Sequence, residues 1–244
     1  MTSGFRINTA ADDAAGLATS EFLKAQIRSY TVAERNAADG ISMAQLADGA
    51  LGELHDVLGR MRELAMQASN GGITDDVRGY LQSEFGALSS EIGRIQQSTS
   101  FNGNSLIGSA ATALVSFQVG LNDASYDQIN VTFNGLDLSN VIAATIVDQS
   151  NALTSLSVID GSVAQVSRSR SEFGASMNKL EVATNNILTM RSNITAANSR
   201  IRDTDYAEAS AKLARTQVLS QASIAILAQS TQLPKLAFAL ISGG

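Results

Sequence analysis

The residues that could take part in catalysis or metal binding are few in this sequence and badly spaced for either role. Its only histidine, His55, lies within a helical pattern and has Asp56 directly beside it instead of one turn away. The chain has no cysteine, so nothing completes a zinc site. A catalytic triad would need His55, and a rod-like helix offers no cleft around it. We therefore interpret His55 as a solvated helix residue and expect neither an enzyme nor a metal or other cofactor.

Two pairs of adjacent aspartates could be taken for general acid–base pairs. Asp12–Asp13 and Asp75–Asp76 each stand in a predicted first helical turn, where the helix dipole favours negative charge. Thr9 precedes the first pair and can act as an N-cap. The sequence has no phosphate-binding glycine loop and no glycine pattern that joins a strand to a helix. The aspartate pairs therefore indicate helix starts and not acid–base chemistry.

The composition favours long helices over a compact enzyme. The 244 residues include one proline, no tryptophan and only 5% aromatic residues. Alanine, serine and asparagine are frequent, which is typical of helices that pack closely. The net charge of −6 argues against a nucleic-acid-binding protein, because such a protein needs a basic surface. We expect no membrane span, since no run approaches ~18 apolar residues, and no cleaved signal peptide.

Three stretches carry the periodicity of packed helices, at about residues 9–69, 74–98 and 152–201. In the first stretch the apolar positions alternate in spacings of four and three, and in the third the bulky positions are seven residues apart. We expect the first and third stretches to pack along these positions. The packing residues of the first stretch are Leu51, Leu54, Leu58 and Met61. Those of the third are Val166, Phe173, Leu180, Ile187, Ile194 and Ile201.

The remaining segments complete the predicted fold. Within about 101–150, two short stretches alternate apolar and polar residues on either side of the turn residues Gly120–Asp123, which predicts a small β-hairpin. The segment 203–244 is helical until Pro234 and has an apolar stripe, so alone it would be marginally stable in water. The sequence thus predicts a mostly α protein, an elongated coiled-coil-like bundle of long helices with a small β-hairpin region.

Four long runs of the sequence are more specific than a generic coiled coil. They are SGFRINTAADDAAGLATSEFLKAQIRS, RNAADGISMAQLADGALGELHDVLGRMRELAMQASNG, SFNGNSLI and NNILTMRSNITAANSRIRDTDYAEASAKLARTQVLSQASIAILAQSTQLP. These runs resemble the core of bacterial flagellins, cover most of the chain and follow the order of that family.

The resemblance implies a domain organisation. Residues 1–202 would form the flagellin core rod, and residues 203–244 the C-terminal helix of the inner tube. Flagellins carry a further apolar helix before the SGFRIN-like motif, whereas Met1 stands almost directly before it here. We therefore expect a chain that lacks the N-terminal inner-tube helix, as a truncated, processed or atypical form, with a labile or partner-dependent C-terminal helix.

The resemblance also implies a function. The chain would be a structural subunit of the flagellar filament, self-assembling for motility, located outside the cell and exported by the flagellar type III apparatus. Its partners would be other flagellin subunits and a flagellar export chaperone on the C-terminal helix. Two alternatives stay open. A hook–filament junction protein shares the terminal helices, and a flagellin-like surface protein that binds polysaccharide would need a groove in residues 108–150.

One helix face gives a further expectation about partners. Arg60, Leu64 and Gln67 are spaced by four and three and are offset from the packing positions, so we expect an exposed stripe that includes a leucine. Such a stripe is usually without function. However, flagellins recognised by the Toll-like receptor of innate immunity carry matching residues, with a glutamate at the position of Glu84. The resemblance therefore implies that this patch binds the host receptor and, in the filament, a neighbouring subunit.

Overall fold

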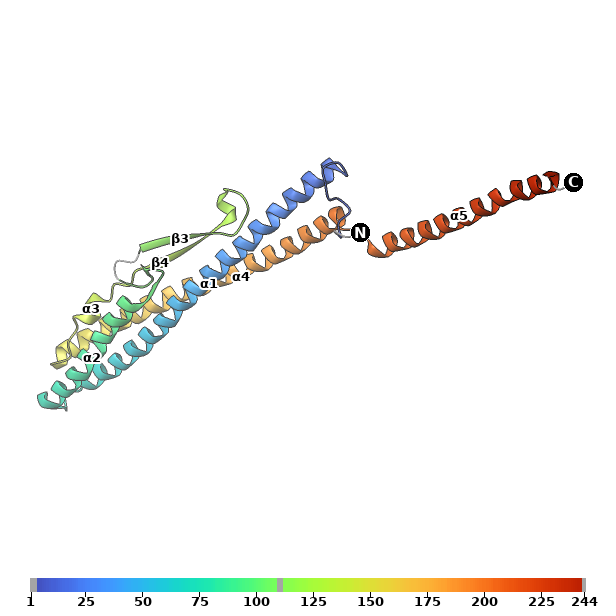
Figure 1. Ribbon diagram of the computed structural model, residues 1–244. Coiled ribbons are helices and arrows are strands. Elements are labelled where there is room, and N and C mark those ends of the chain that lie inside the picture. Colours follow the sequence, from blue (N-terminus) through green and yellow to red (C-terminus); the bar gives the residue numbers. More distant parts are fainter. Residues whose placement is uncertain (1–3, 109–111, 243–244) are drawn as a thin grey trace. The chain divides into compact units, whose positions relative to one another are not determined.

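The computed structural model describes residues 4–108 and 112–242. Its helices are α1 (Ala14–Ala68), α2 (Asp75–Ser98), α3 (Ser139–Ile142), α4 (Gln149–Arg202) and α5 (Tyr206–Ser242). Its strands are β1 (Ser100–Phe101), β2 (Asn104–Ser105), β3 (Thr112–Gln118) and β4 (Gln128–Asn134), with a 3-10 helix at Ser125–Asp127. The predicted fold class, long helices with small antiparallel strand pairs, is confirmed (Figure 1). The chain divides into two compact units, residues 26–192 and residues 1–25 with 193–244.

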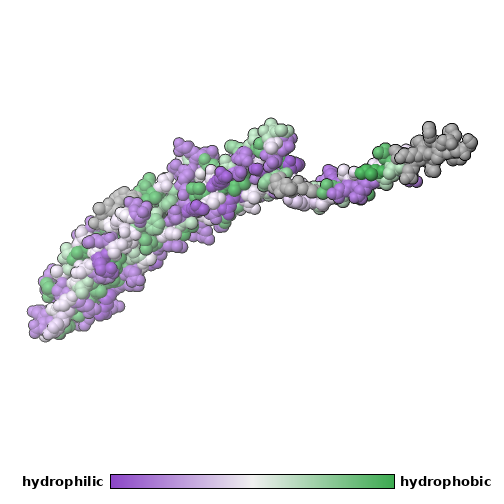
Figure 2. Space-filling view, in the orientation of Figure 1, coloured by the Kyte–Doolittle hydropathy of each residue, from purple (hydrophilic) through white to green (hydrophobic). Residues whose placement is uncertain are grey.

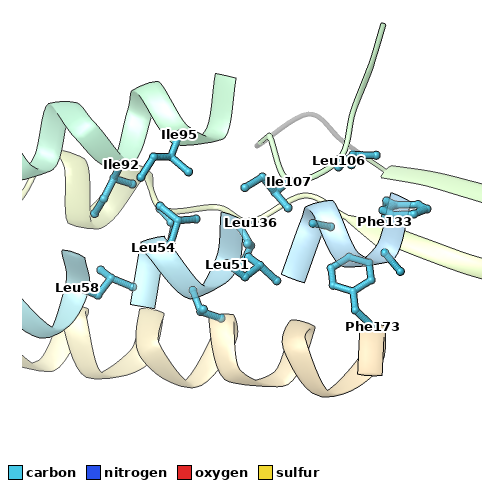
Figure 3. Packing of buried hydrophobic residues seen from close by; sticks show 14 of the residues in the cluster. Leu51, Leu54, Leu58, Ile92, Ile95, Leu106, Ile107, Phe133, Leu136 and Phe173 are labelled. Carbon is cyan, nitrogen blue, oxygen red and sulfur yellow. The ribbon is translucent and has the colours of Figure 1, made fainter. Parts of the chain in front are cut away.

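The unit of residues 26–192 is built on α1 and α4, with α2 alongside them (Figure 1). Side chains from all three helices and from the connecting segments meet in one apolar cluster (Figure 3). Eight of the packing residues named from the sequence are at most 3% exposed, namely Leu51, Leu54, Leu58, Met61, Val166, Phe173, Leu180 and Ile187. Ile194 and Ile201 belong to the other unit and are half-buried.

Ion pairs connect α1 with α4 outside the apolar cluster. Asp48 accepts a hydrogen bond from Nε of Arg170 at 2.9 Å, and Arg62 donates to Asp160 at 2.7 Å. A third pair joins Glu34 and Arg191. The Arg62–Asp160 pair is well exposed to solvent and the Arg170–Asp48 pair is partly exposed. We therefore expect each pair to add little stability and to act mainly on the alignment of the two helices.

Helix α2 holds the segment 136–146, which contains the short helix α3, with three polar side chains spaced seven residues apart. Gln82, Ser89 and Gln96 lie on one face of α2 and form hydrogen bonds with backbone groups of that segment. The partners are Ile146 N at 2.6 Å, Ile142 O at 2.9 Å and Leu136 O at 2.8 Å. Buried backbone groups without a partner are costly, and these bonds satisfy three of them.

The β3–β4 hairpin packs on the helices through one face. The strands pair antiparallel over their full length, and the ring of Phe133 lies 5.3 Å from that of Phe173 in α4. Asn36 of α1 donates a hydrogen bond to Gln118 O at 3.0 Å. A Cβ atom at Gly40 would come within 3.2 Å of the Phe117 ring. A glycine is therefore suited to the point where the hairpin meets α1.

The second unit contains the start of α1. The carboxylate of Asp12 accepts hydrogen bonds from the backbone N–H groups of Asn8 and Thr9 and from the Thr9 hydroxyl. These bonds, that of the Thr9 N–H first, hold the pKa of Asp12 below its ordinary value. Asp13 accepts from Gly16 N at 2.9 Å and caps α1. The predicted Thr9 cap is therefore wrong, because the Thr9 hydroxyl donates to Asp12.

Helix α5 belongs to the same unit. Asp205 caps its start by accepting from Ala207 N and Glu208 N. The helix continues past Pro234, although the sequence predicted an interruption there, since an interior proline costs stability without always ending a helix. None of the helices in the described part of the chain is long and apolar enough to cross a membrane.

Candidate interaction surfaces

The structure gives His55 a different environment from the predicted one. His55 is half-buried, and its Nδ1 atom is buried without a hydrogen-bond partner within the described residues. The expectation of a solvated histidine is therefore only partly correct. His55 lies seven residues from both Asp48 and Arg62, which pair with α4, so its side of α1 is partly covered by that helix. In residues 4–108 and 112–242, no three acidic, histidine or cysteine side chains are grouped so that they could hold a metal ion.

The predicted receptor patch joins α1 and α2 through Arg60. Its Nε donates to Glu84 at 2.8 Å, and another guanidinium nitrogen donates to Glu63 at 2.9 Å. The hydrogen bond with Glu63, followed by that with Glu84, raises the pKa of Arg60, so Arg60 stays charged. The side chains of Arg60 and Glu84 are 50% and 46% exposed, and Gln67 is also exposed. The structure thus brings three of the four predicted residues to the surface.

Leu64 is the exception in this patch. It is 1% exposed and belongs to the apolar cluster that includes Phe85 of α2. The expectation of an exposed leucine is wrong, because Leu64, although offset from the packing positions that face α4, packs in the same apolar cluster as Phe85 of α2. Glu63 was not among the predicted residues, yet it accepts a hydrogen bond from Arg60. It stands three residues after Arg60 on the same helix, a spacing that favours such an ion pair.

Helix α5 presents a second surface, which is apolar. Of residues 206–230, all but Ala209 are exposed, and hydrophobic side chains are visible along this helix (Figure 2). The large apolar side chains are between 49% and 68% exposed. They are Leu213, Val218, Leu219, Ile224, Ile226 and Leu227. So much apolar surface on one helix is typical of a segment that binds a partner.

Two open hollows lie beside the contact between Asn36 and Gln118. One has a volume of about 410 Å³ and the other about 380 Å³, and both are lined by α1 and β3. Phe101 and Phe117 line the second hollow, whereas the first is lined by amide, aliphatic and acidic side chains. The exposed Tyr126 lines neither of these two hollows. Both hollows are only partly lined by residues 108–150, where the surface-protein alternative requires a groove.

Comparison with known proteins shows which family the chain belongs to. Residues 1–112 match the bacterial flagellin N-terminal helical region, and residues 156–240 match the bacterial flagellin C-terminal helical region. The flagellin of Halalkalibacterium halodurans is 42% identical over an alignment of 245 positions, which covers 99% of this chain and 89% of that protein. The chain belongs to the bacterial flagellin family.

Solved structures agree with this assignment. The crystal structure of Bacillus cereus flagellin matches with a TM-score of 0.57 and 31% identity, over 67% of this chain and 94% of that chain. A second solved structure, of a protein from Vibrio parahaemolyticus named as a putative flagellar hook-associated protein, has a TM-score of 0.66. The match covers 79% of this chain and 100% of that chain. At 14% identity the second likeness shows the fold alone. This flagellin is a structural subunit of the bacterial flagellar filament and, like its family, not an enzyme.

Proposed function

We propose that this flagellin is held in the filament through α5, whose apolar side chains are covered by neighbouring subunits outside the cell. The observation that carries the proposal is the exposure of the large apolar residues in residues 206–230. Full burial of one such side chain stabilises a contact by about 1.5–3 kcal/mol. A helix that exposes several of them is marginal alone and stable when covered.

The test uses filament seeds and two matched pairs of substitutions in α5. Ile224→Asp with Leu227→Asp places charge on the apolar positions, and Gln221→Asp with Gln229→Asp places the same charge on polar ones. We expect the unaltered chain and the glutamine variant to sediment with seeds, and the apolar variant to stay in solution. If both variants fail equally, or if the unaltered chain does not sediment, assembly through the apolar residues of α5 is refuted.

We further propose that a flagellar export chaperone covers the same residues before export through the flagellar type III apparatus. One apolar helix cannot contact the chaperone and the filament at the same positions, so the two should compete. Arg215 is exposed in α5, which supplies a readout. Chaperone binding should slow tryptic cleavage after Arg215, and unchanged cleavage at saturating chaperone would argue against this site.

The host Toll-like receptor is the third proposed partner. We assign its contact to Arg60, Gln67 and Glu84, while the buried Leu64 supports the patch from beneath. Arg60→Asp should abolish receptor activation in a reporter assay, because it places three carboxylates together. Arg28→Asp is a matched control at another exposed arginine of α1. Full receptor activation by the Arg60→Asp variant would show that this patch does not bind the receptor.

Polysaccharide binding remains the alternative function, and the two hollows beside Asn36 are the observation in its favour. Amide and carboxylate groups are suited to sugar hydroxyls, and Phe101 offers an aromatic face. Binding of neutral polysaccharide to the monomer, lost on Asn36→Ala, would support this reading. A filament subunit without this role should show no binding.

A further inference from the structure

The break between α4 and α5 contains no residue that forces a helix to end. Helix α4 ends at Arg202 and α5 begins at Tyr206. The residues between them are Asp203, Thr204 and Asp205, and neither proline nor glycine is among them. Asp205 caps α5, but an N-cap is used only where the preceding chain has already left the helix. The cause of the break must therefore include contacts from elsewhere in the chain.

Residues 4–6 supply these contacts through the backbone. Arg6 N donates to Arg202 O at 2.6 Å, and Thr204 N donates to Gly4 O at 3.2 Å. The two segments form an antiparallel bridge. Both members of this bridge lie in the same compact unit.

The backbone groups that residues 4–6 bind, Arg202 O and Thr204 N, would form hydrogen bonds within the helix if α4 and α5 were continuous. In an α-helix each N–H donates to the carbonyl four residues earlier. Arg202 O would accept from Tyr206 N, and Thr204 N would donate to Arg200 O. Because residues 4–6 bind both groups, the helix cannot pass through the junction while they are in place.

Side chains strengthen the same contact. Arg6 donates from its guanidinium to Ile201 O at 2.8 Å, which is a further helix acceptor. The Arg202 guanidinium lies 4.6 Å from the centre of the Phe5 ring, a cation–π distance, and pairs with Glu21 at 2.9 Å. Arg202 therefore connects the end of α4 with both the N-terminal segment and the start of α1.

Gly4 is required by this geometry. Its φ angle of +74° lies in the left-handed region, and a Cβ atom would come within 3.3 Å of the Tyr206 hydroxyl. Glycine alone adopts this conformation without strain. A larger residue at this position should weaken the contact of residues 4–6 with the junction without touching α4 itself.

We propose that residues 4–6 are a clasp that keeps α4 and α5 as two helices, and that release of the clasp joins them into one continuous helix. On release, Arg202 O and Thr204 N exchange their bonds with Arg6 N and Gly4 O for two helical bonds, so the number of backbone hydrogen bonds at the junction is unchanged. The junction then has two discrete arrangements, which is the property of a conformational switch. The clasp decides whether α5 is a continuation of α4.

The test measures a distance across the junction by electron paramagnetic resonance. The chain has no cysteine, so Asn193→Cys and Ala211→Cys give two unique label sites on exposed positions. A continuous helix would place them five turns apart on one face, at about 27 Å. We expect no narrow peak near that distance in the otherwise unaltered chain. Gly4→Val, and separately Phe5→Ala with Arg202→Ala, should produce it.

Matched controls are available for both side chains of the clasp. Phe22→Ala removes an exposed aromatic residue of α1, and Arg200→Ala removes an exposed arginine of α4. Both should leave the distance distribution unchanged. The proposal is overturned if the clasp variants keep the original distribution or become broad without the peak. A narrow peak at about 27 Å in the unaltered chain, or the same change in the controls, would also overturn it.

Discussion

Arg78 closes the turn between α1 and α2, and its removal should be among the most damaging substitutions of a charged residue. The residue is 8% exposed. Its Nε donates to Ala68 O at 3.1 Å, and a terminal nitrogen donates to Asn70 O at 3.1 Å. The last carbonyls of a helix have no partner within the helix. Arg78 therefore acts as a C-terminal cap for α1 that comes from the next helix.

The cost of Arg78→Ala follows from these contacts. Hydrogen bonds to a charged group contribute about 1.5–3 kcal/mol each, and buried carbonyls left without a partner add a penalty. The bond to Asp75 adds little, because the Asp75 side chain is 94% exposed. We expect a loss of about 2–4 kcal/mol in the free energy of unfolding. Arg78→Lys should lose part of this, since an ammonium group cannot reproduce the forked geometry.

Urea denaturation followed by circular dichroism measures the effect. The midpoint should fall for Arg78→Ala, fall less for Arg78→Lys and stay nearly unchanged for the control Asp75→Ala. The slope of the transition should stay the same, because the surface exposed on unfolding is similar. If Arg78→Ala unfolds at the same urea concentration as the unaltered chain, the cap carries no stability and the reasoning is wrong.

Three further changes test other parts of the structure. Gly40→Ala should lower the midpoint of thermal unfolding, because overpacking against Leu180 and the Phe117 ring costs about 1–3 kcal/mol and exceeds the gain of about 0.5–1 kcal/mol from replacing a helical glycine. An unchanged midpoint would refute the close contact. The pKa of Asp12 is lowered in the folded protein, so the ionised carboxylate should fully stabilise the turn at residues 8–12 above the ordinary pKa of an aspartate. This stabilisation should be lost as the pH falls through the lower pKa of the folded state. Amide hydrogen exchange of Thr9 measures the effect, and protection that does not change with pH in this range would contradict it. Trypsin should cleave faster after the exposed Arg215 than after Arg202, because Arg202 is half-buried in the clasp. Faster cleavage after Arg202 would contradict the clasp.

The helices could be predicted from the sequence because their packing repeats. Residues such as Phe173 and Leu180 recur every seven positions, and a single partner helix explains that spacing. Leu64 could not be placed in the same way, because it packs toward a second partner at a position that the repeat does not mark. The start of α1 was also misjudged, since Thr9 and Asp13 are both good N-caps and only the bond from Gly16 decides between them.

The polar contacts lie beyond sequence reasoning for a different reason. Gln82, Ser89 and Gln96 look like the solvent face of α2. They bind the backbone of segment 136–146, whose only helix, α3, is too short to give a sequence pattern. The partners of the clasp are far apart in the sequence, and Arg6 and Ile201 are separated by 195 positions. Nothing in the local sequence at Arg202 indicates that Phe5 lies over its guanidinium.

The ion pairs between α1 and α4 have a consequence for alignment. A slide of one helix by seven residues would keep the spacing of the bulky positions, so the repeat of apolar side chains alone only weakly opposes it. Such a slide would set Asp48 against Val163 or Met177, and Arg62 against Leu153 or Ser167. Every shifted state therefore loses charge partners that the native one has. The apolar side chains hold α1 and α4 together, and the ion pairs add a preference for the native alignment over alignments shifted by seven residues.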